Sequence, residues 1–296
     1  MRDVAGMTAF ITGGGSGVGF GMAQAFSGAG MNVVIADIRQ DHLDQAMQSF
    51  GGQRVHPIRM DVTDRAAMAR AADETERVFG KVHVLCNNAG INLFNDIGTA
   101  SYDDWDWILG VNLGGTVNGL QAFIPRIKSH GEGGHVVNTA SMACFIASAR
   151  AGIYCASKFA VRGLSEALRG SLLPHRIGVS VLCPGLVKSA IYESEKIRPA
   201  HLSARAIPTD PEFLARLAQV HELGMSPQEI GQKVLRAIQR NDFYIFPHAE
   251  FKEELRAIFD EALNALPDEP VPEARLAFEE SRRANAAKAR AEWPKL

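Results

Sequence analysis

The feature that most constrains the fold is the alternation of short apolar segments with helical patterns over the first 185 residues. Apolar runs such as 32–37 (NVVIAD), 81–87 (KVHVLCN) and 177–185 (IGVSVLCPG) have the length of buried strands. Parallel sheets that are covered on both faces have strands of this kind, with helices between them. The sequence therefore predicts an α/β fold with a doubly wound parallel sheet.

The expected elements follow from the same patterns. Strands are expected at 7–12, 32–37, 55–62, 81–87, 133–141, 177–185 and 243–247, and helices at 17–30, 40–50, 63–80, 101–128, 152–172 and 226–240. Asp41 is expected to cap the second helix, Thr63 or Asp64 the third, and Ser226 the last, where Pro227 takes the first helical position. This is a three-layer α/β/α arrangement of the Rossmann type.

One domain with an appended arm accounts for the whole length. Residues 1–249 are predicted to form the Rossmann domain, in which the polar, proline-containing stretch 186–225 supplies substrate-binding loops and short helices. Residues 250–296 are charged and alanine-rich, with a break at 267–276 (PDEPVPEARL), and predict a C-terminal helical arm. No internal repeat is present.

Charge and composition exclude several classes of protein. The net charge is −2 with 46% hydrophobic residues, and a basic field that would bind nucleic acid or anionic lipid is lacking. No apolar run has the length of a membrane span, and the first expected strand starts too early for a signal peptide. Cys86, Cys144, Cys155 and Cys183 lack metal-ligand spacing, which predicts buried reduced thiols, no metal site and a cytoplasmic location.

A glycine-rich loop, FITGGGSGVGFG, joins the first strand to the first helix. Gly13, Gly17 and Gly19 would let the backbone approach a pyrophosphate, which the free N–H groups of the helix N-terminus can bind. A tight turn without a ligand is the alternative. The position of the loop in the first strand–helix unit favours a dinucleotide site.

Asp37, at the end of the second strand, predicts the choice of dinucleotide. Its carboxylate can accept hydrogen bonds from the adenosine ribose and would repel a 2′-phosphate. Ser16, just before Gly17, adds no positive charge, so NAD is expected in preference to NADP. Arg39 leaves NADP open, because its guanidinium would be attracted to a phosphate unless it is an ordinary surface arginine.

Three polar side chains lie in an otherwise small and apolar stretch, 141–158. Tyr154 and Lys158 are four residues apart and share one helix face, and Ser141 ends the preceding strand. The ammonium of Lys158 and an oxidised nicotinamide should both lower the tyrosine pKa from about 10. A half-buried structural tyrosine and a strand-end hydroxyl are the alternatives.

Together, these motifs resemble the short-chain dehydrogenase/reductase family over residues 6–190. They are T-G-x-x-x-G-x-G (from Thr12), DV (61–62), NNAG (87–90), Asn112, Ser141 with Y-x-x-x-K, and PGLVKS (184–189), where Ser189 replaces a threonine. The resemblance implies an NAD(P)-dependent alcohol dehydrogenase or ketoreductase. It also implies a homodimer or homotetramer.

The resemblance assigns roles to individual residues. Tyr154 is the general acid/base, Ser141 binds the substrate oxygen, Lys158 binds the nicotinamide ribose, and Asn112 holds a water for proton transfer, unless Asn112 is a structural amide in a helix kink. The implied cofactor contacts are Thr12, Gly13, Gly15, Ser16, Gly17, Val18, Gly19, Asp37, Ile38, Asp61, Val62, Asn88, Ala89, Gly90, Tyr154, Lys158, Pro184, Gly185, Val187 and Ser189.

Substrate contacts are expected from the loops 91–97, 142–150 and 186–215, which are apolar and aromatic and carry no pair of arginines. The candidate substrate residues are Phe94, Ser141, Phe145, Tyr154, Leu186 and Tyr192. They favour a hydrophobic secondary alcohol, including benzylic ones, and its ketone. The segments around 35–47, 102–107 and 133–145, with the arm, resemble a bacterial subgroup that includes the Cα-dehydrogenases of lignin-derived β-aryl ethers, which use NAD.

Two positions depart from the family pattern. His83 stands where an aspartate is usual, and we expect a changed hydrogen bond there without loss of activity. Cys144 stands where a glycine is usual, three residues after Ser141, and we expect it to reshape the pocket wall.

Three other functions stay open at this stage. One is an NADP-dependent carbonyl reductase of the same family. Another is an epimerase or dehydratase of related extended proteins, although their loop spacing is usually T-G-x-x-G-x-x-G. The third is a non-catalytic NAD-binding sensor or scaffold, although such proteins typically lose the tyrosine or the lysine.

Overall fold

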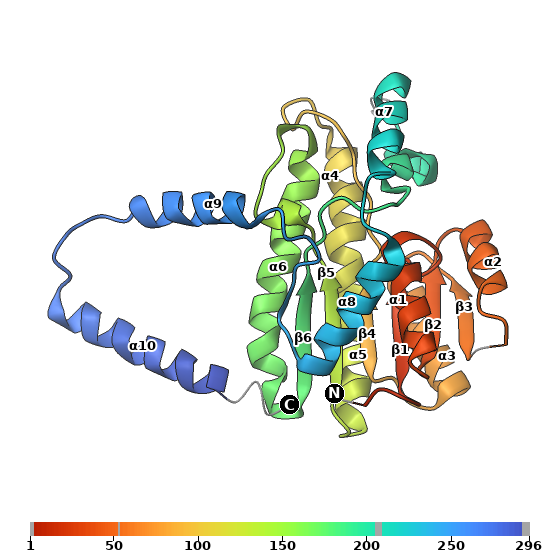
Figure 1. The fold of residues 1–296 in the computed structure, drawn as a ribbon, viewed down its shortest axis with the longest axis horizontal. Helices are drawn as coiled ribbons and strands as arrows, with labels where there is room; N and C mark the ends of the chain where they lie inside the picture. Colours follow the sequence, from red (N-terminus) through yellow and green to blue (C-terminus); the bar gives the residue numbers. More distant parts are fainter. Residues whose placement is uncertain (1–2, 53, 205–208, 292–296) are drawn as a thin grey trace.

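The computed structural model describes residues 3–52, 54–204 and 209–291. Their strands form one parallel sheet in the order β3-β2-β1-β4-β5-β6-β7 (Figure 1). The strands are β1 (Thr8–Thr12), β2 (Asn32–Asp37), β3 (Val55–Arg59), β4 (Val84–Asn87), β5 (Gly134–Thr139), β6 (Ile177–Leu182) and β7 (Tyr244–Ile245). The order reverses between β1 and β4, so the sheet is doubly wound, which confirms the predicted fold.

Helices and short helical turns connect the strands. The α-helices are α1 (Gly17–Gly28), α2 (Gln40–Gln48), α3 (Arg65–Phe79), α4 (Tyr102–Leu109), α5 (Gly115–Ser129), α6 (Gly152–Leu172), α7 (Pro211–His221), α8 (Pro227–Arg240), α9 (Lys252–Asn264) and α10 (Glu273–Ala291). A π-helical segment, η1 (Gly110–Gly114), joins α4 to α5. The 3₁₀ turns are η2 (Met142–Cys144), η3 (Ala149–Ala151), η4 (Leu173–His175), η5 (Ile191–Ile197) and η6 (Ala200–Leu202).

Two hydrophobic cores lie on the two faces of the sheet. Alternate strand residues point to opposite faces, so Phe10 belongs to one core and Ile11 to the other. The Phe10 ring packs against Phe123 of α5 with ring centroids 4.3 Å apart, on the face that α3, α5 and α6 cover. The other face is covered by α1, α2 and α8. The carboxyl ends of the strands are left free to form a site.

Local details correct two sequence expectations. The helix expected at 101–128 is divided into α4, η1 and α5. Asp41 does not cap α2, whose N-cap is Arg39; Asp41 lies in the first turn and binds the Arg39 guanidinium instead. The Asp64 and Ser226 caps are confirmed, since their side chains accept hydrogen bonds from the N–H groups three residues ahead.

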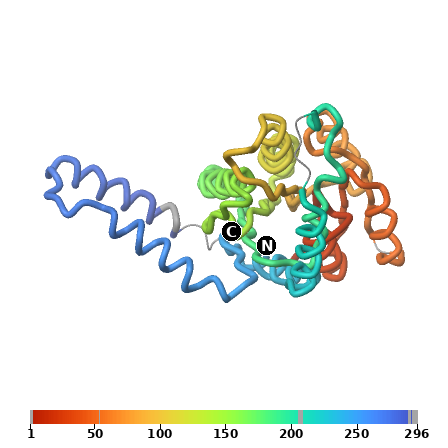
Figure 2. The backbone as a smooth tube through the Cα atoms, turned by 90° about the horizontal axis from the view of Figure 1, so that it is seen from above, coloured from red at the N-terminus to blue at the C-terminus, as the bar shows by residue number. Residues whose placement is uncertain are grey.

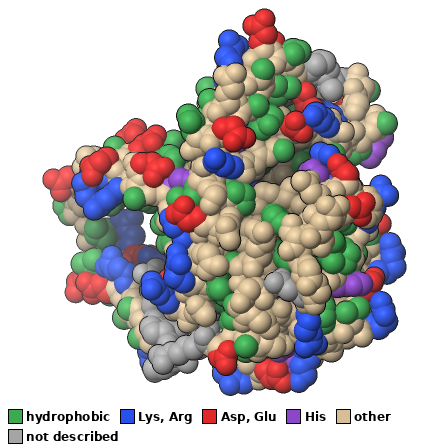
Figure 3. Space-filling model, turned by 45° about the vertical axis from the view of Figure 1, so that its right-hand side comes forward, with side chains coloured by type: hydrophobic (Ala, Val, Ile, Leu, Met, Phe, Trp, Pro, Cys, Tyr) green, Lys and Arg blue, Asp and Glu red, His purple; other side chains and the backbone are tan. Residues whose placement is uncertain are grey.

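The chain after β7 leaves the sheet. Helices α9 and α10 project from the body as an arm (Figures 1 and 2), and no side chain described on either helix is buried. Charged side chains of both signs lie on the arm (Figure 3). None of the helices in the described part of the chain is both long and apolar enough to cross a membrane.

Candidate active site

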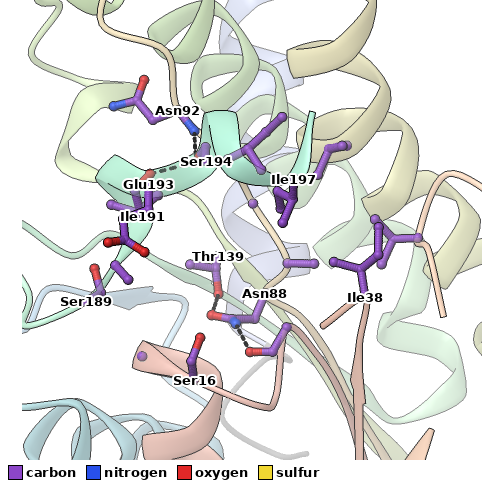
Figure 4. Close-up of a pocket in the computed structure, with 18 of the residues that line it drawn as sticks. Ser16, Ile38, Asn88, Asn92, Thr139, Ser189, Ile191, Glu193, Ser194 and Ile197 are labelled. Carbon is purple, nitrogen blue, oxygen red and sulfur yellow. Dashed lines mark hydrogen bonds between the residues drawn. The ribbon is translucent and has the colours of Figure 1, made fainter. Parts of the chain in front are cut away.

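A cavity of about 590 Å³ opens at the carboxyl ends of the strands. Figure 4 shows Ser16 and Asn88 below it and the turn η5 above it. One part, the cofactor half, is lined by residues that follow β1 to β4, within 13–18, 36–42, 60–63 and 88–90. The other part, the substrate half, is lined by residues 91–94, Trp107 of α4, residues 186–202 and His221. The two parts meet at Ser141, Tyr154 and Lys158, which also line the cavity.

The glycine loop leaves room for a ligand because side chains are absent where backbone segments touch. Gly13 and Gly17 have φ values of +62° and +50°, in the left-handed region. A Cβ on Gly19 would lie 2.1 Å from the carbonyl oxygen of Gly13. Helix α1 begins at Gly17 without a side-chain cap on its N-cap Ser16. Its first N–H groups therefore remain available for an anion such as a pyrophosphate.

The loop is held from below by the end of β4. Thr12 Oγ1 accepts hydrogen bonds from the N–H groups of Asn88 (2.9 Å) and Ala89 (3.0 Å). The Asn88 amide donates to the carbonyl oxygens of Thr12 and Gly13 at 3.1 and 3.3 Å. These residues join the two halves of the sheet at the point where the strand order reverses.

Two carboxylates, those of Asp37 and Asp61, line the cofactor half of the cavity. Asp37 Oδ2 accepts a hydrogen bond from the N–H of Gly15 (3.1 Å), and Oδ1 accepts one from the N–H of Arg39 (3.0 Å). The Arg39 guanidinium is bound to Asp41. Asp61 accepts hydrogen bonds from Thr63 N and Oγ1, both at 2.8 Å. The carboxylate of Asp37 is thus fixed by backbone donors.

Ser141, Tyr154 and Lys158 converge from two elements. Ser141 follows β5, and its Oγ accepts a hydrogen bond from Ala143 N (3.1 Å) and lies 3.4 Å from the Pro184 carbonyl oxygen. Tyr154 and Lys158 are one turn apart on α6, and the lysine Nζ is 5.5 Å from the tyrosine ring centroid. Lys158 is buried and donates a hydrogen bond to the Thr139 carbonyl oxygen at 2.9 Å.

The pKa of Tyr154 shifts in the direction opposite to the sequence expectation. Burial raises it to about 12, and a hydrogen bond with Ser141 offsets only part of this effect. Burial also lowers the pKa of Lys158 to about 8. Desolvation disfavours the charged form of both groups. In the protein alone, burial is therefore the main cause of both pKa shifts.

Asn112 lies in the π-helical segment, beside the lysine. Its Oδ1 accepts from Ile91 N (2.9 Å), and its Nδ2 donates to the Ile91 carbonyl oxygen (3.0 Å) and to Ser157 Oγ (2.9 Å). A Cβ on Gly90 would lie 3.3 Å from both Asn112 Oδ1 and Lys158 Nζ. The amide and the ammonium thus share one small space, although Asn112 does not line the cavity.

Most of the residues assigned to the cofactor line the cavity. The exceptions are Thr12, Gly15 and Gly19, which do not line the cavity. Of the substrate candidates, Phe94 and Leu186 line it, whereas Phe145 and Tyr192 do not. Phe145 lies instead among Phe246 and Phe259, with ring centroids 5.7 and 6.1 Å away.

Several lining residues were not among the sequence candidates. Trp107 comes from a helix, so the rule that substrate contacts come from loops did not select it. The other additions in the substrate half are Ile91, Asn92, Ala190, Glu193, Ser194, Ile197, Pro199, His201, Leu202 and His221. Most belong to the stretch 186–225, which was predicted as a substrate segment and from which Leu186 and Tyr192 were the chosen candidates; positions 205–208 of that stretch lie outside the described residues.

The two departures from the family pattern lie away from the cavity. His83 Nδ1 accepts from Thr8 N (3.2 Å), and its Nε2 is 3.0 Å from Glu132. Together with His130, these two form a group with possible metal-ligand spacing, but His130 already pairs with the Val82 carbonyl oxygen and the Glu132 N–H. The hydrogen bonds on these rings oppose metal binding.

Cys144 does not reshape the pocket wall as expected. It is fully buried, and its sulfur lies 3.7 Å from that of Cys183. The side chain at this position belongs to the hydrophobic core on the face of the sheet that α3, α5 and α6 cover. All four cysteines are buried free thiols, as predicted.

Comparison with known proteins agrees with this geometry. A family model described as short chain dehydrogenase matches residues 7–199. A C alpha-dehydrogenase from Sphingobium sp. (strain NBRC 103272 / SYK-6) is 40% identical over 92% of this chain and 91% of its own.

Two solved structures are similar throughout. A short-chain dehydrogenase from Novosphingobium aromaticivorans is 46% identical, covers 97% of this chain and 99% of its own, and has a TM-score of 0.83. A short chain dehydrogenase/reductase from Burkholderia phymatum in complex with NAD is 34% identical, covers 92% of this chain and 100% of its own, and has a TM-score of 0.84.

Proposed function

The chain belongs to the short-chain dehydrogenase/reductase family, and on that premise we propose that this oxidoreductase interconverts a benzylic secondary alcohol and its ketone with NAD. The observation that carries the proposal is the position of Tyr154 and Ser141. They lie where the cofactor half meets a substrate half that is lined mostly by apolar side chains. The relative from Sphingobium, named a C alpha-dehydrogenase, supports the choice of substrate.

The residues of the cofactor half fit a nicotinamide dinucleotide. The open backbone at Gly13, Gly17 and Gly19 and the free N-terminus of α1 suit a pyrophosphate. The fixed carboxylate of Asp37 suits ribose hydroxyls and repels a 2′-phosphate. Arg39 is already bound to Asp41, so it offers no free cation for that phosphate. These contacts support NAD over NADP, in line with the NAD complex of the Burkholderia relative.

Proton transfer is proposed for Tyr154. When bound, oxidised nicotinamide takes a hydride from the alcohol carbon and brings a positive charge beside the phenol. Tyr154 would first lose its proton beside that charge, the phenolate would then accept the alcohol proton, and in the reverse direction the phenol would donate its proton to the ketone oxygen. Ser141 Oγ, held by Ala143 N, would donate a hydrogen bond to the same oxygen and stabilise its developing charge. The pKa of about 12 keeps Tyr154 a phenol in the protein alone and suits its role as an acid.

Lys158 and Asn112 would support this step. The pKa of about 8 allows Lys158 to gain and lose a proton near neutral pH, and its ammonium is close to the tyrosine ring. Asn112 fixes Ile91 and Ser157 beside the lysine, so it would keep this region in place. The water predicted at Asn112 stays a proposal.

A neutral aromatic substrate suits the substrate half. Phe94, Trp107 and Ile197 line it, and apolar burial is the main source of affinity for such ligands. Among the described lining residues the lysine and arginine side chains are Arg39 and Lys158. Arg39 is paired and Lys158 adjoins Tyr154, so neither is placed to hold an anionic group at the far end of the substrate half.

A substrate panel tests the proposal. NADH or NADPH formation would be followed with benzylic, aliphatic and steroid alcohols at equal concentrations. We expect kcat/KM to be at least about tenfold higher for a benzylic alcohol, a difference of about 1.4 kcal/mol in transition-state binding. Equal or higher kcat/KM with NADP would refute the NAD assignment. A preference for steroid or aliphatic alcohols would refute the benzylic one, and NAD binding without turnover on any alcohol would indicate a sensor.

A further inference from the structure

A buried ion pair connects the roof of the cavity to its wall. Arg198 Nη1 lies 2.6 Å from Asp104 Oδ1, and the two side chains are only 6% and 3% exposed. The other ion pairs of the described chain have at least one partner that is a quarter or more exposed. Isolated charges are rarely buried to this extent, because each loses its hydration.

Asp104 uses its two oxygens for different partners. Oδ2 accepts hydrogen bonds from Ser101 N (2.8 Å) and Ser101 Oγ (2.9 Å), which completes the capping box at the start of α4. Oδ1 remains for Arg198. Burial opposes ionisation, but the hydrogen bonds from Ser101 and Arg198 hold the pKa of Asp104 below its usual value. The carboxylate is therefore anchored to α4 before it binds the arginine.

Arg198 connects this anchor to the segment above the cavity. That segment, the covering segment, comprises residues 191–202, with the turns η5 and η6. Arg198 lies between the two turns, and Nε donates to the Leu202 carbonyl oxygen at 2.6 Å. Its guanidinium carbon is 5.0 Å from the centroid of the Trp107 ring. The guanidinium of Arg198 thus contacts both the turn η6, through Leu202, and Trp107 in the wall of the cavity.

The neighbours of this pair face the cavity. Ile197 and Pro199, on either side of Arg198, line the cavity, and so do Leu202 and Trp107. The pair itself does not line the cavity. Its members therefore do not face the cavity themselves, but they contact or adjoin four residues that line it.

We propose that Asp104 and Arg198 are positioning residues that hold the covering segment and Trp107 against an aromatic substrate. The proposal rests on the function proposed above. It predicts that the pair controls affinity for bulky benzylic alcohols and leaves hydride and proton transfer unchanged, because Ser141 follows β5 and Tyr154 and Lys158 lie on α6, outside the covering segment and α4.

Kinetics of variants test the proposal. In Arg198→Met and Asp104→Asn we expect KM for a bulky benzylic alcohol to rise about tenfold, with kcat and the Kd for NADH within about threefold of the wild type. The KM for a small alcohol such as 2-propanol should rise less, since this substrate makes fewer contacts with the covering segment. Arg198→Lys keeps the positive charge but loses the planar guanidinium with its several N–H donors, so it should give an intermediate KM. Unchanged KM in folded Arg198→Met would overturn the proposal.

Arg126→Met is the matched control. Arg126 also binds two acidic side chains, Asp73 and Glu76, but it lies on α5 away from the cavity. We expect it to lower the melting temperature and leave KM unchanged. An equal rise of KM in this control would mean that the effect of Arg198 is general destabilisation.

Hydrogen exchange separates this proposal from the proposed function, because it requires no turnover. In the Arg198 variants, amides of 191–202 and of the first turn of α4 should exchange faster, while those of α1 and α3 should not. Failure of the wild type to oxidise any benzylic alcohol would refute the proposed function alone. Unchanged exchange at 191–202 in Arg198→Met and Arg198→Lys would refute the positioning role.

Discussion

The cofactor half and the substrate half of the cavity are built in different ways. The first consists mainly of backbone at the ends of neighbouring strands, where missing side chains and fixed N–H groups form the surface. The second consists of side chains from segments far apart in the sequence, held by isolated contacts such as Asn92 N to Ser194 Oγ (3.1 Å). Backbone shape tolerates few substitutions, whereas a side-chain surface can change residue by residue. Substrate choice is therefore expected to vary while cofactor binding persists.

The boundary between the halves should show the largest effect. Tyr154→Phe removes the only proposed proton donor, so we expect turnover to fall about 10²- to 10⁴-fold. NADH affinity, measured by fluorescence titration, should stay unchanged because the ring remains. Tyr192→Phe, a tyrosine outside the cavity, is the control. Substantial turnover in Tyr154→Phe would contradict the mechanism.

A single added methyl group, in Gly19→Ala, should disrupt the cofactor half. In Gly19→Ala the new Cβ would lie 2.1 Å from the Gly13 carbonyl oxygen, so the loop must shift. Overpacking of this kind costs about 1–3 kcal/mol, and we expect the Kd for NADH to rise roughly tenfold to a hundredfold.

Gly28→Ala is the control for this change, since it lies on the same helix with open space around it. It should leave the Kd unchanged. Equal binding by both variants would show that the close contact at Gly19 does not shape the cofactor half.

The buried amine of Lys158, at the boundary between the two halves, should make the stability of the protein depend on pH. Its folded pKa of about 8 is below the value of an unfolded lysine. The folded state therefore binds fewer protons between pH 8 and about 10.4, and stability should rise with pH across that window. Lys158→Met removes the buried charge, so below pH 8 we expect it to raise the free energy of unfolding by about 1–3 kcal/mol while it abolishes activity.

Urea unfolding below pH 8 and near pH 10 measures this effect. The advantage of Lys158→Met should shrink at the higher pH. Lys128→Met, on the exposed surface of α5, is the control. A difference that does not depend on pH would contradict the assigned pKa.

The substrate half should respond most mildly. Phe94→Ala removes a lining ring, and we expect KM for a benzylic alcohol to rise about tenfold with unchanged NADH affinity. Phe145→Ala should leave KM unchanged, although loss of this buried ring should lower the free energy of unfolding by about 3–5 kcal/mol. A rise of KM in Phe145→Ala alone would instead support the prediction from the sequence that Phe145 contacts the substrate.

Most residues that the sequence assigned to the cofactor line the cavity, because local patterns determine where they lie. A glycine between a strand and a helix, or an aspartate at a strand end such as Asp37, has one position once the sheet order is known. Asp41 was misassigned because a neighbouring guanidinium, on Arg39, competed for its carboxylate. That competition is a local contact which cap preferences do not include.

The substrate half was predicted less well because its surface depends on how distant segments pack. Phe145 is apolar and follows Ser141 closely, yet it turns toward Phe246 and Phe259. Trp107 was not selected, and it packs with residues far from it in the sequence: the guanidinium carbon of Arg198 lies 5.0 Å from its ring centroid. No periodicity or spacing reports such a contact.

The π-helical segment η1 has a consequence for how the long helix between β4 and β5 can change. An α-helix advances about 100° per residue, so one extra residue in a turn shifts the phase of all that follows. Before the shift, α4 presents Trp107 to the cavity, and after it α5 presents Phe123 to the sheet. The continuous helical stretch from α4 to α5 thus has two independent helical phases, one on each side of η1. Substitutions can tune the face of α4 toward a substrate without rotating the face of α5 out of the core.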